Sequence, residues 1–69
     1  MDELIGKRVR ITYMEDVQRK YHGSGPVGPW CYLLAVDMPM LKLSDREDGW
    51  GAEWVNVALM ESVSGPNPP

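Results

Sequence analysis

The side chains best suited to covalent chemistry in this sequence are one cysteine, Cys31, and one histidine, His22. Nucleophilic catalysis requires a thiol or hydroxyl within reach of a base that a third group orients. Cys31 lies in an apolar run, WCYLLAV, where a thiol is expected to be buried and inert. A metal site requires three or four converging ligands, and one cysteine with one histidine does not provide the usual set. We therefore predict that the protein is not an enzyme and holds neither a metal nor a cofactor.

Aromatic side chains are numerous for so short a chain, with three tryptophans and three tyrosines in 69 residues. Trp50 lies between two glycines in a charged segment, where packing into a core is difficult to arrange. Tyr21 and Trp30 lie within and just after a glycine- and proline-rich segment, residues 16–29. Exposed aromatic side chains on loops are typical of peptide-binding grooves and of interface hot spots. We predict that Tyr21, Trp30 and Trp50 contact a protein partner or a second copy of the chain.

The charge of the chain is negative overall but unevenly distributed. Seven Lys and Arg residues against ten Asp and Glu residues give a net charge of -3. This balance argues against nucleic acid as a partner, because contacts to phosphates provide most non-specific affinity. Two solvated faces of opposite charge are the simplest interpretation. The alternative is a nucleic-acid-binding surface made by four basic residues near the N-terminus, with a tyrosine available for stacking: Arg8, Arg10, Arg19, Lys20 and Tyr21.

The elements that must position these residues are short β-strands. Residues 7–14, KRVRITYM, alternate between apolar and polar, which indicates a strand with one solvent-exposed face. Residues 30–37 are apolar on both faces, which indicates a central strand or one that bends sharply. Further strands are expected at 41–43, 53–57 and 61–64, after a hairpin turn at Pro39 and with a tight turn before the last strand. Residues 16–29 are expected to form a long, mobile loop, in which residues 17–21 could make one turn.

The sequence shows five short strands and no helical periodicity that extends over ten residues. This predicts an all-β protein that forms a small closed or nearly closed barrel. Residues 1–64 would form one domain, and residues 65–69, GPNPP, a disordered tail. The single cysteine, the acidic N-terminus and the lack of a long apolar run predict a cytoplasmic protein without a membrane partner. Because so small a domain is marginally stable by itself, a homo-oligomer is also expected.

The pattern IGKRVRITYMED…YLLAVDMPMLKL…WVNVALMESV resembles the SH3-like and Sm-like small β-barrels. Typical members open with Gly-Lys-x-Val and an alternating strand, and close with a strand, a one-turn 3-10 helix and a strand. The resemblance covers Ile5 to Val63 and implies a five-stranded barrel with a long loop after the first strand. The Sm hairpin that reads RNA carries Asp-x-x-Met-Asn. Here Asp37 and Met40 match that motif, whereas Leu41 replaces the asparagine, so the motif is incomplete.

Three hypotheses about function follow. The first is a non-catalytic SH3-like module that binds a protein partner or associates with itself. The alternative is a module that binds RNA or DNA. The third, an enzyme assembled at a pore between several copies, would require an oligomer.

Overall fold

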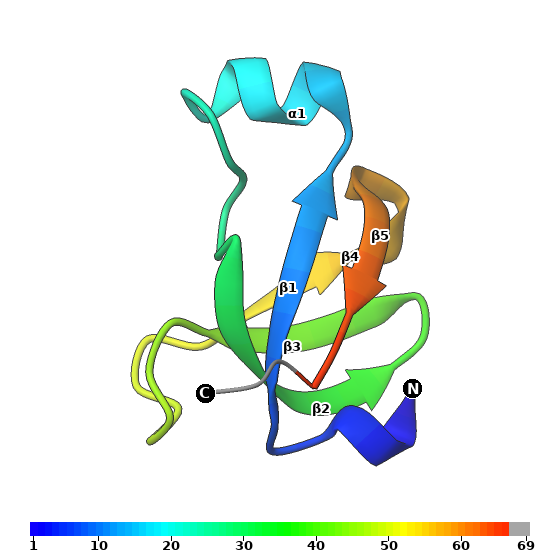
Figure 1. The fold of residues 1–69 in the computed structure, drawn as a ribbon, viewed down its shortest axis with the longest axis vertical. Coiled ribbons are helices and arrows are strands. Elements are labelled where there is room, and N and C mark those ends of the chain that lie inside the picture. The colour runs from blue at the N-terminus through cyan, green and yellow to red at the C-terminus, as the bar shows by residue number, and fades with distance from the viewer. Residues whose placement is uncertain (67–69) are drawn as a thin grey trace.

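The computed structural model describes residues 1–66 and contains five strands, one short helix and two 3-10 turns (Figure 1). In chain order the elements are η1 (Asp2–Leu4), β1 (Arg8–Tyr13), α1 (Glu15–Lys20), β2 (Trp30–Asp37), β3 (Met40–Ser44), β4 (Glu53–Asn56), η2 (Val57–Leu59) and β5 (Met60–Ser64). The all-β class predicted from the sequence is confirmed. So are the expected strands, whose ends differ from the prediction by at most one residue, and the 3-10 turn before the last strand.

The strands form one antiparallel sheet in the order β4-β3-β2-β1-β5. The last strand therefore lies beside the first, and β4 and β5 lie at the two edges. They do not pair, so the sheet is not closed into the expected barrel. The side chain of Asn56 accepts a hydrogen bond of 2.8 Å from the backbone N–H of Ala58, which turns the chain into η2 before β5 begins. One side of the molecule is consequently left open between the two edges.

The sequence left two interpretations open for a second strand that is apolar on both faces, a central position or a sharp bend. β2 is the central strand of the sheet, and it is also irregular. Its pairing with β3 shifts register between Leu33 and Ala35. Before the shift Cys31 and Leu33 face the core, and after it Val36 lies opposite the buried Leu41. The bend lets one strand wrap around the core, as bulged strands do.

The core is filled by alternate residues of the strands. The buried apolar residues of the strands are Val9, Ile11, Tyr13, Cys31, Leu33, Leu41, Leu43 and Val55. Val17 and Val27 join them from the segment after β1. The alternation that indicated the first strand, with one face in solvent, is thus confirmed. Val57, just after β4, lies half-buried at the edge of the core.

The segment after β1 differs from the expected loop because it begins with a helix, α1, where the sequence suggested no more than a turn around residues 17–21. Acidic residues in the first turn and basic residues in the last, Arg19 and Lys20, suit the dipole of this helix. The rest of the segment is fixed to the core. The hydroxyl of Tyr13 donates a hydrogen bond to the carbonyl of Val27, and Gly25 lies directly against the Tyr13 ring. Of the predicted tail, residues 67–69 lie outside the described residues.

Candidate interaction surfaces

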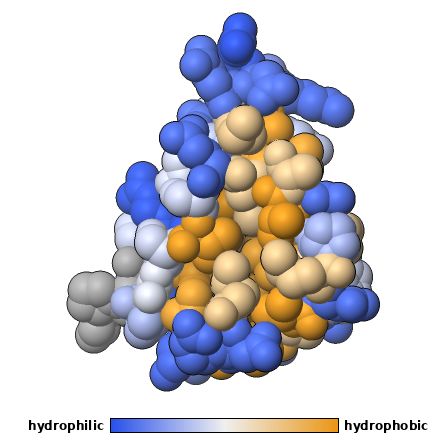
Figure 2. All heavy atoms as spheres, turned by 90° about the vertical axis from the view of Figure 1, so that its right-hand side faces the viewer, coloured by the Kyte–Doolittle hydropathy of each residue, from blue (hydrophilic) through white to orange (hydrophobic). Residues whose placement is uncertain are grey.

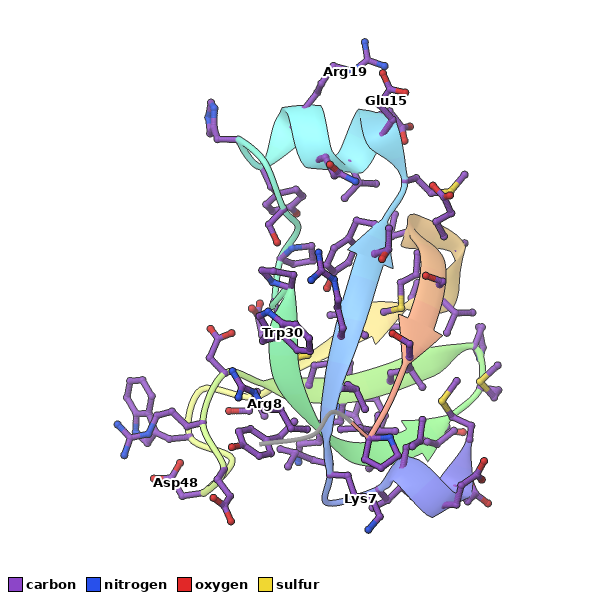
Figure 3. All side chains as sticks on the ribbon, in the orientation of Figure 1. Lys7, Arg8, Glu15, Arg19, Trp30 and Asp48 are labelled. Carbon is purple, nitrogen blue, oxygen red and sulfur yellow. The ribbon has the colours of Figure 1, made fainter. Side chains whose placement is uncertain are left out.

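An arginine–tryptophan cluster lies on the outer face of β1 and β2. The register places Arg10 opposite Trp30 and Arg8 opposite Tyr32. The guanidinium carbons of Arg8 and Arg10 lie 5.4 Å and 5.0 Å from the centroid of the Trp30 indole, within the range of a cation–π contact (Figure 3). The structure thus brings together one residue predicted to bind a protein partner and two predicted to bind nucleic acid.

Neither arginine of this cluster is paired with a carboxylate in the part of the chain that the structure describes. The ion pairs found there join the N-terminal amine to Glu3, Arg19 to Glu15 and Arg46 to Asp48. Arg8 and Arg10 are both exposed, so their outward N–H groups remain available for an anion. The simplest interpretation is structural: the two guanidinium groups cover the Trp30 indole and hold it in place. Such a contact contributes about 0.5–1 kcal/mol to stability at an exposed site.

The connection between β3 and β4, residues 45–52, presents Trp50 to solvent. Asp48 organises this connection by accepting hydrogen bonds from the Arg46 side chain, the shorter of them 2.8 Å, and one of 2.9 Å from the Trp50 backbone. The bond from Arg46, followed by the bond from Trp50, lowers the pKa of the Asp48 carboxyl. The buried Ser44 hydroxyl donates to the Trp50 carbonyl at 2.8 Å. With this backbone fixed, the Trp50 side chain remains 75% exposed.

A wide, shallow depression beside this connection is lined by Tyr32 and by four consecutive charged residues, Asp45, Arg46, Glu47 and Asp48. Because Tyr32 lies opposite Arg8 in the sheet, acidic groups border the arginine–tryptophan cluster. Figure 3 shows Asp48 on the same side of the molecule as Arg8 and Trp30. The neighbouring carboxylates weaken the positive potential that the two arginines create.

The remaining predicted residues lie apart from this cluster. Tyr21 follows the last turn of α1 and is 43% exposed, at the opposite end of the molecule from the connection that carries Trp50 (Figure 1). Arg19 and Lys20 lie in α1, where Arg19 pairs with Glu15 at 3.6 Å. The three predicted aromatic residues therefore do not line one groove, and the four basic residues form two groups. Their roles in binding stay predictions.

The one thiol is buried in the core. Cys31 is 1% exposed, and burial, followed by the charge of Asp45, raises its pKa to about 12. His22 is exposed, in the loop after α1. Among residues 1–66, no three His, Cys, Asp or Glu side chains converge in a way that could hold a metal ion. Nor does this part of the chain contain a helix that is both long and apolar enough to cross a membrane.

A broad apolar surface, which we call the open face, lies where the sheet fails to close. Figure 2 views this side, where η1, the turn between β2 and β3, η2 and β5 gather, and apolar side chains form a continuous band between polar ends. We define the open face by the apolar residues that these elements and their neighbouring turns carry, which are half-buried residues packed against the core and two exposed methionines: Leu4, Val36, Val57, Leu59, Met60 and Val63, with Met14 and Met38.

Backbone hydrogen bonds hold both methionines to this face. The N–H of Met14 donates to the carbonyl of Leu59 at 2.9 Å. The N–H of Val57 donates to the carbonyl of Pro39 at 2.9 Å, which fixes the turn that carries Met38 against η2. Met38 is 62% exposed. A closed barrel, as the sequence predicts, would have left these residues inside or at its ends, so this surface was not expected.

Comparisons with known proteins give one similarity over nearly the whole chain. The chain is 28% identical over 72 aligned residues to subunit alpha 1 of the acetyl-CoA decarbonylase/synthase complex from Methanosarcina barkeri. The alignment covers 94% of this chain but only 9% of that subunit. No protein-family model matches the chain, and no solved structure matches it.

Proposed function

We propose that this chain is a non-catalytic protein-interaction module, related to the SH3-like small barrels, that binds another protein surface through its open face. The observation that carries the proposal is the continuous band of apolar side chains on one side of so small a domain (Figure 2). Contiguous exposed apolar surface of this kind marks interaction sites in soluble proteins. Methionine is common on such surfaces because its flexible, polarisable side chain adapts to different partners.

Two further observations support the proposal. The last strand lies beside the first and follows a 3-10 turn, which agrees with the closing pattern of the SH3-like barrels. The similar segment of the decarbonylase/synthase subunit is a small part of a long chain, as expected for a module that works beside other protein surfaces. With one buried thiol, the module suits a reducing compartment such as the cytoplasm.

Site-specific photo-crosslinking in the organism that makes the protein tests the proposal. A photoreactive amino acid in place of Met38, on the open face, should give discrete adducts of protein mass. The matched control carries the same amino acid in place of Arg46, which is exposed in the connection between β3 and β4. Adducts at neither position, or equal adducts at both, would contradict the proposal.

A second candidate, binding of single-stranded nucleic acid, is favoured by the arginine–tryptophan cluster. Trp30 provides a flat surface for a base, and Arg8 and Arg10 provide cations for the adjoining phosphates. The acidic residues at the neighbouring depression and the net charge of -3 oppose it. For this reason we rank it second.

The separation of the basic residues into two groups allows a controlled test. Fluorescence anisotropy with labelled single-stranded RNA and DNA at low salt should show binding that weakens as salt rises. Replacing Arg8 and Arg10 together with alanine should abolish it, whereas replacing Arg19 and Lys20 together should leave most of it. If the wild-type protein binds neither RNA nor DNA at low salt, nucleic-acid binding is excluded.

A further inference from the structure

A small pocket lies beside the arginine–tryptophan cluster, between β1, α1 and the segment that returns from α1 to β2, residues 21–29. We infer that this pocket binds a tetrahedral oxyanion, which is either free phosphate or the phosphate group of a larger molecule. The inference goes beyond the proposed function, because none of the residues that line the pocket belongs to the open face.

The pocket forms where β1 and β2 part. The residues of β1 that pair with β2 end at Arg10, and next to them the N–H of Ile11 donates to the carbonyl of Pro29 at 2.8 Å. Beyond this bond the returning segment lies apart from β1 (Figure 1), and it meets β1 again where Gly25 contacts the Tyr13 ring. The volume of the pocket is about 110 Å³.

This volume limits the size of the ligand. A water molecule takes about 30 Å³ in the liquid, so the pocket has room for about three or four waters or for one ligand of a few atoms. A phosphate or sulfate ion is of this size, whereas a nucleoside or a sugar is larger. A larger molecule would therefore place only its phosphate group in the pocket.

The polar side chains that line the pocket are donors suited to an anion. The amide nitrogen of Gln18 donates to the carbonyl of Tyr13 at 2.8 Å, which fixes the side chain and leaves a second N–H for a ligand. Thr12 adds a hydroxyl, and Arg10 adds a positive charge. Among the described residues, none that lines the pocket is acidic. A guanidinium group together with neutral donors is well suited to bind an oxyanion.

The hydroxyl of Ser24 is the clearest sign that the pocket takes a polar ligand. Its oxygen is buried, and it has no hydrogen-bond partner in the part of the chain that the structure describes. Buried hydroxyls nearly always have a partner, because the loss of hydrogen bonds to water is otherwise not compensated. An oxygen of the ligand would accept this hydrogen bond, and the charge of Arg10 favours an anion over water at this place.

The contact with Trp30 restricts the position of the Arg10 side chain. The guanidinium carbon of Arg10 lies 5.0 Å from the centroid of the indole. Arg8 makes a similar contact at 5.4 Å, but it does not line the pocket. The two exposed arginines therefore provide a matched pair of positions, of which only one belongs to the pocket.

The test is a titration of the full chain with inorganic phosphate, followed by NMR of the backbone amides at neutral pH and constant ionic strength. Saturable shifts should be confined to residues around the pocket, with a dissociation constant on the order of 1 mM for so small a ligand. Arg10→Gln should weaken binding about tenfold or more, and Ser24→Ala about threefold or more, because each removes a hydrogen bond to the anion. The control, Arg8→Gln, should stay within about twofold of the wild type, because salt screens a charge outside the pocket.

Two further titrations distinguish the source of the phosphate group. If adenosine monophosphate binds more tightly than inorganic phosphate, the group belongs to a nucleotide or to the end of a nucleic-acid strand, whose base can contact Trp30. If it binds no more tightly, the ligand is the free ion. Adenosine without a phosphate should give no saturable shifts around the pocket. If it shifts the same residues as the nucleotide does, the inference is overturned, because phosphate is then not the group recognised.

Circular dichroism establishes that each variant is folded. The absence of saturable shifts up to about 50 mM phosphate overturns the inference and leaves ordered water as the occupant of the pocket. Equal weakening by Arg8→Gln and Arg10→Gln also overturns it, since the anion would then be attracted to the exposed arginines alone. Binding that Ser24→Ala leaves unchanged has the same consequence.

Discussion

At the scale of single residues, the contact between Tyr13 and Gly25 does most to turn a predicted loop into a fixed part of the molecule. Tyr13 ends β1 and is 1% exposed, and its hydroxyl donates to the carbonyl of Val27. Gly25 lies so close to the Tyr13 ring that there is no room for a side chain at position 25. The glycine is required by this close approach, because a Cβ at position 25 would overlap the ring.

We predict that Gly25→Ala destabilises the fold by about 2 kcal/mol, within the usual cost of overpacking. The added methyl group must displace either the Tyr13 ring or the loop that carries Val27 into the core. Urea unfolding followed by tryptophan fluorescence measures the change in free energy of unfolding. In a Tyr13→Leu background the same substitution should cost much less, because the smaller side chain leaves room for the methyl group. Equal costs in both backgrounds would show that the ring contact is not the cause.

At the scale of elements, the strands could be predicted because each depends on its own alternation. Val9, Ile11, Leu43 and Val55 are buried as period two requires. The apolar residues on both faces of β2 correctly indicated a central strand, although they did not distinguish a central position from a sharp bend. Helix α1 was harder to predict, since six residues are too few to show a helical period. Its charge pattern, acidic at the start and basic at the end, was the available signal.

The candidate surfaces depended on contacts between elements that sequence spacing does not reveal. Trp30 and Arg10 are twenty residues apart in the chain and meet only because β1 and β2 pair in one particular register. The open face exists because β4 and β5 do not pair, and a pattern of strands alone cannot show whether a sheet closes. Three of the five methionines gather on that face, yet in the sequence they are scattered from position 14 to position 60.

At the scale of the whole molecule, the stability of the fold depends on pH through two weakly acidic groups in its core, the Cys31 thiol and the Tyr13 hydroxyl. Burial is the largest cause that raises the pKa of Cys31 from 9.0 to about 12 and that of Tyr13 from 10.0 to about 12. The unfolded chain exposes both groups, so it loses their protons at lower pH than the folded chain does. Alkaline pH therefore favours the unfolded state.

We predict that Cys31 and Tyr13 leave the free energy of unfolding unchanged below about pH 9. As the pH rises further, the free energy of unfolding should fall, and the stabilisation that these two protonated groups provide should be lost near pH 12. Urea unfolding at a fixed protein concentration, in steps from neutral to alkaline pH, measures the fall. Cys31→Ala lowers stability at every pH because it leaves a cavity, but it should make the decline above pH 9 shallower, since the thiol no longer ionises in the unfolded state. A decline of the same steepness in wild type and variant would mean that the thiol is not protected by the core. The side of the molecule where the sheet stays open would then admit water further than the burial of Cys31 implies.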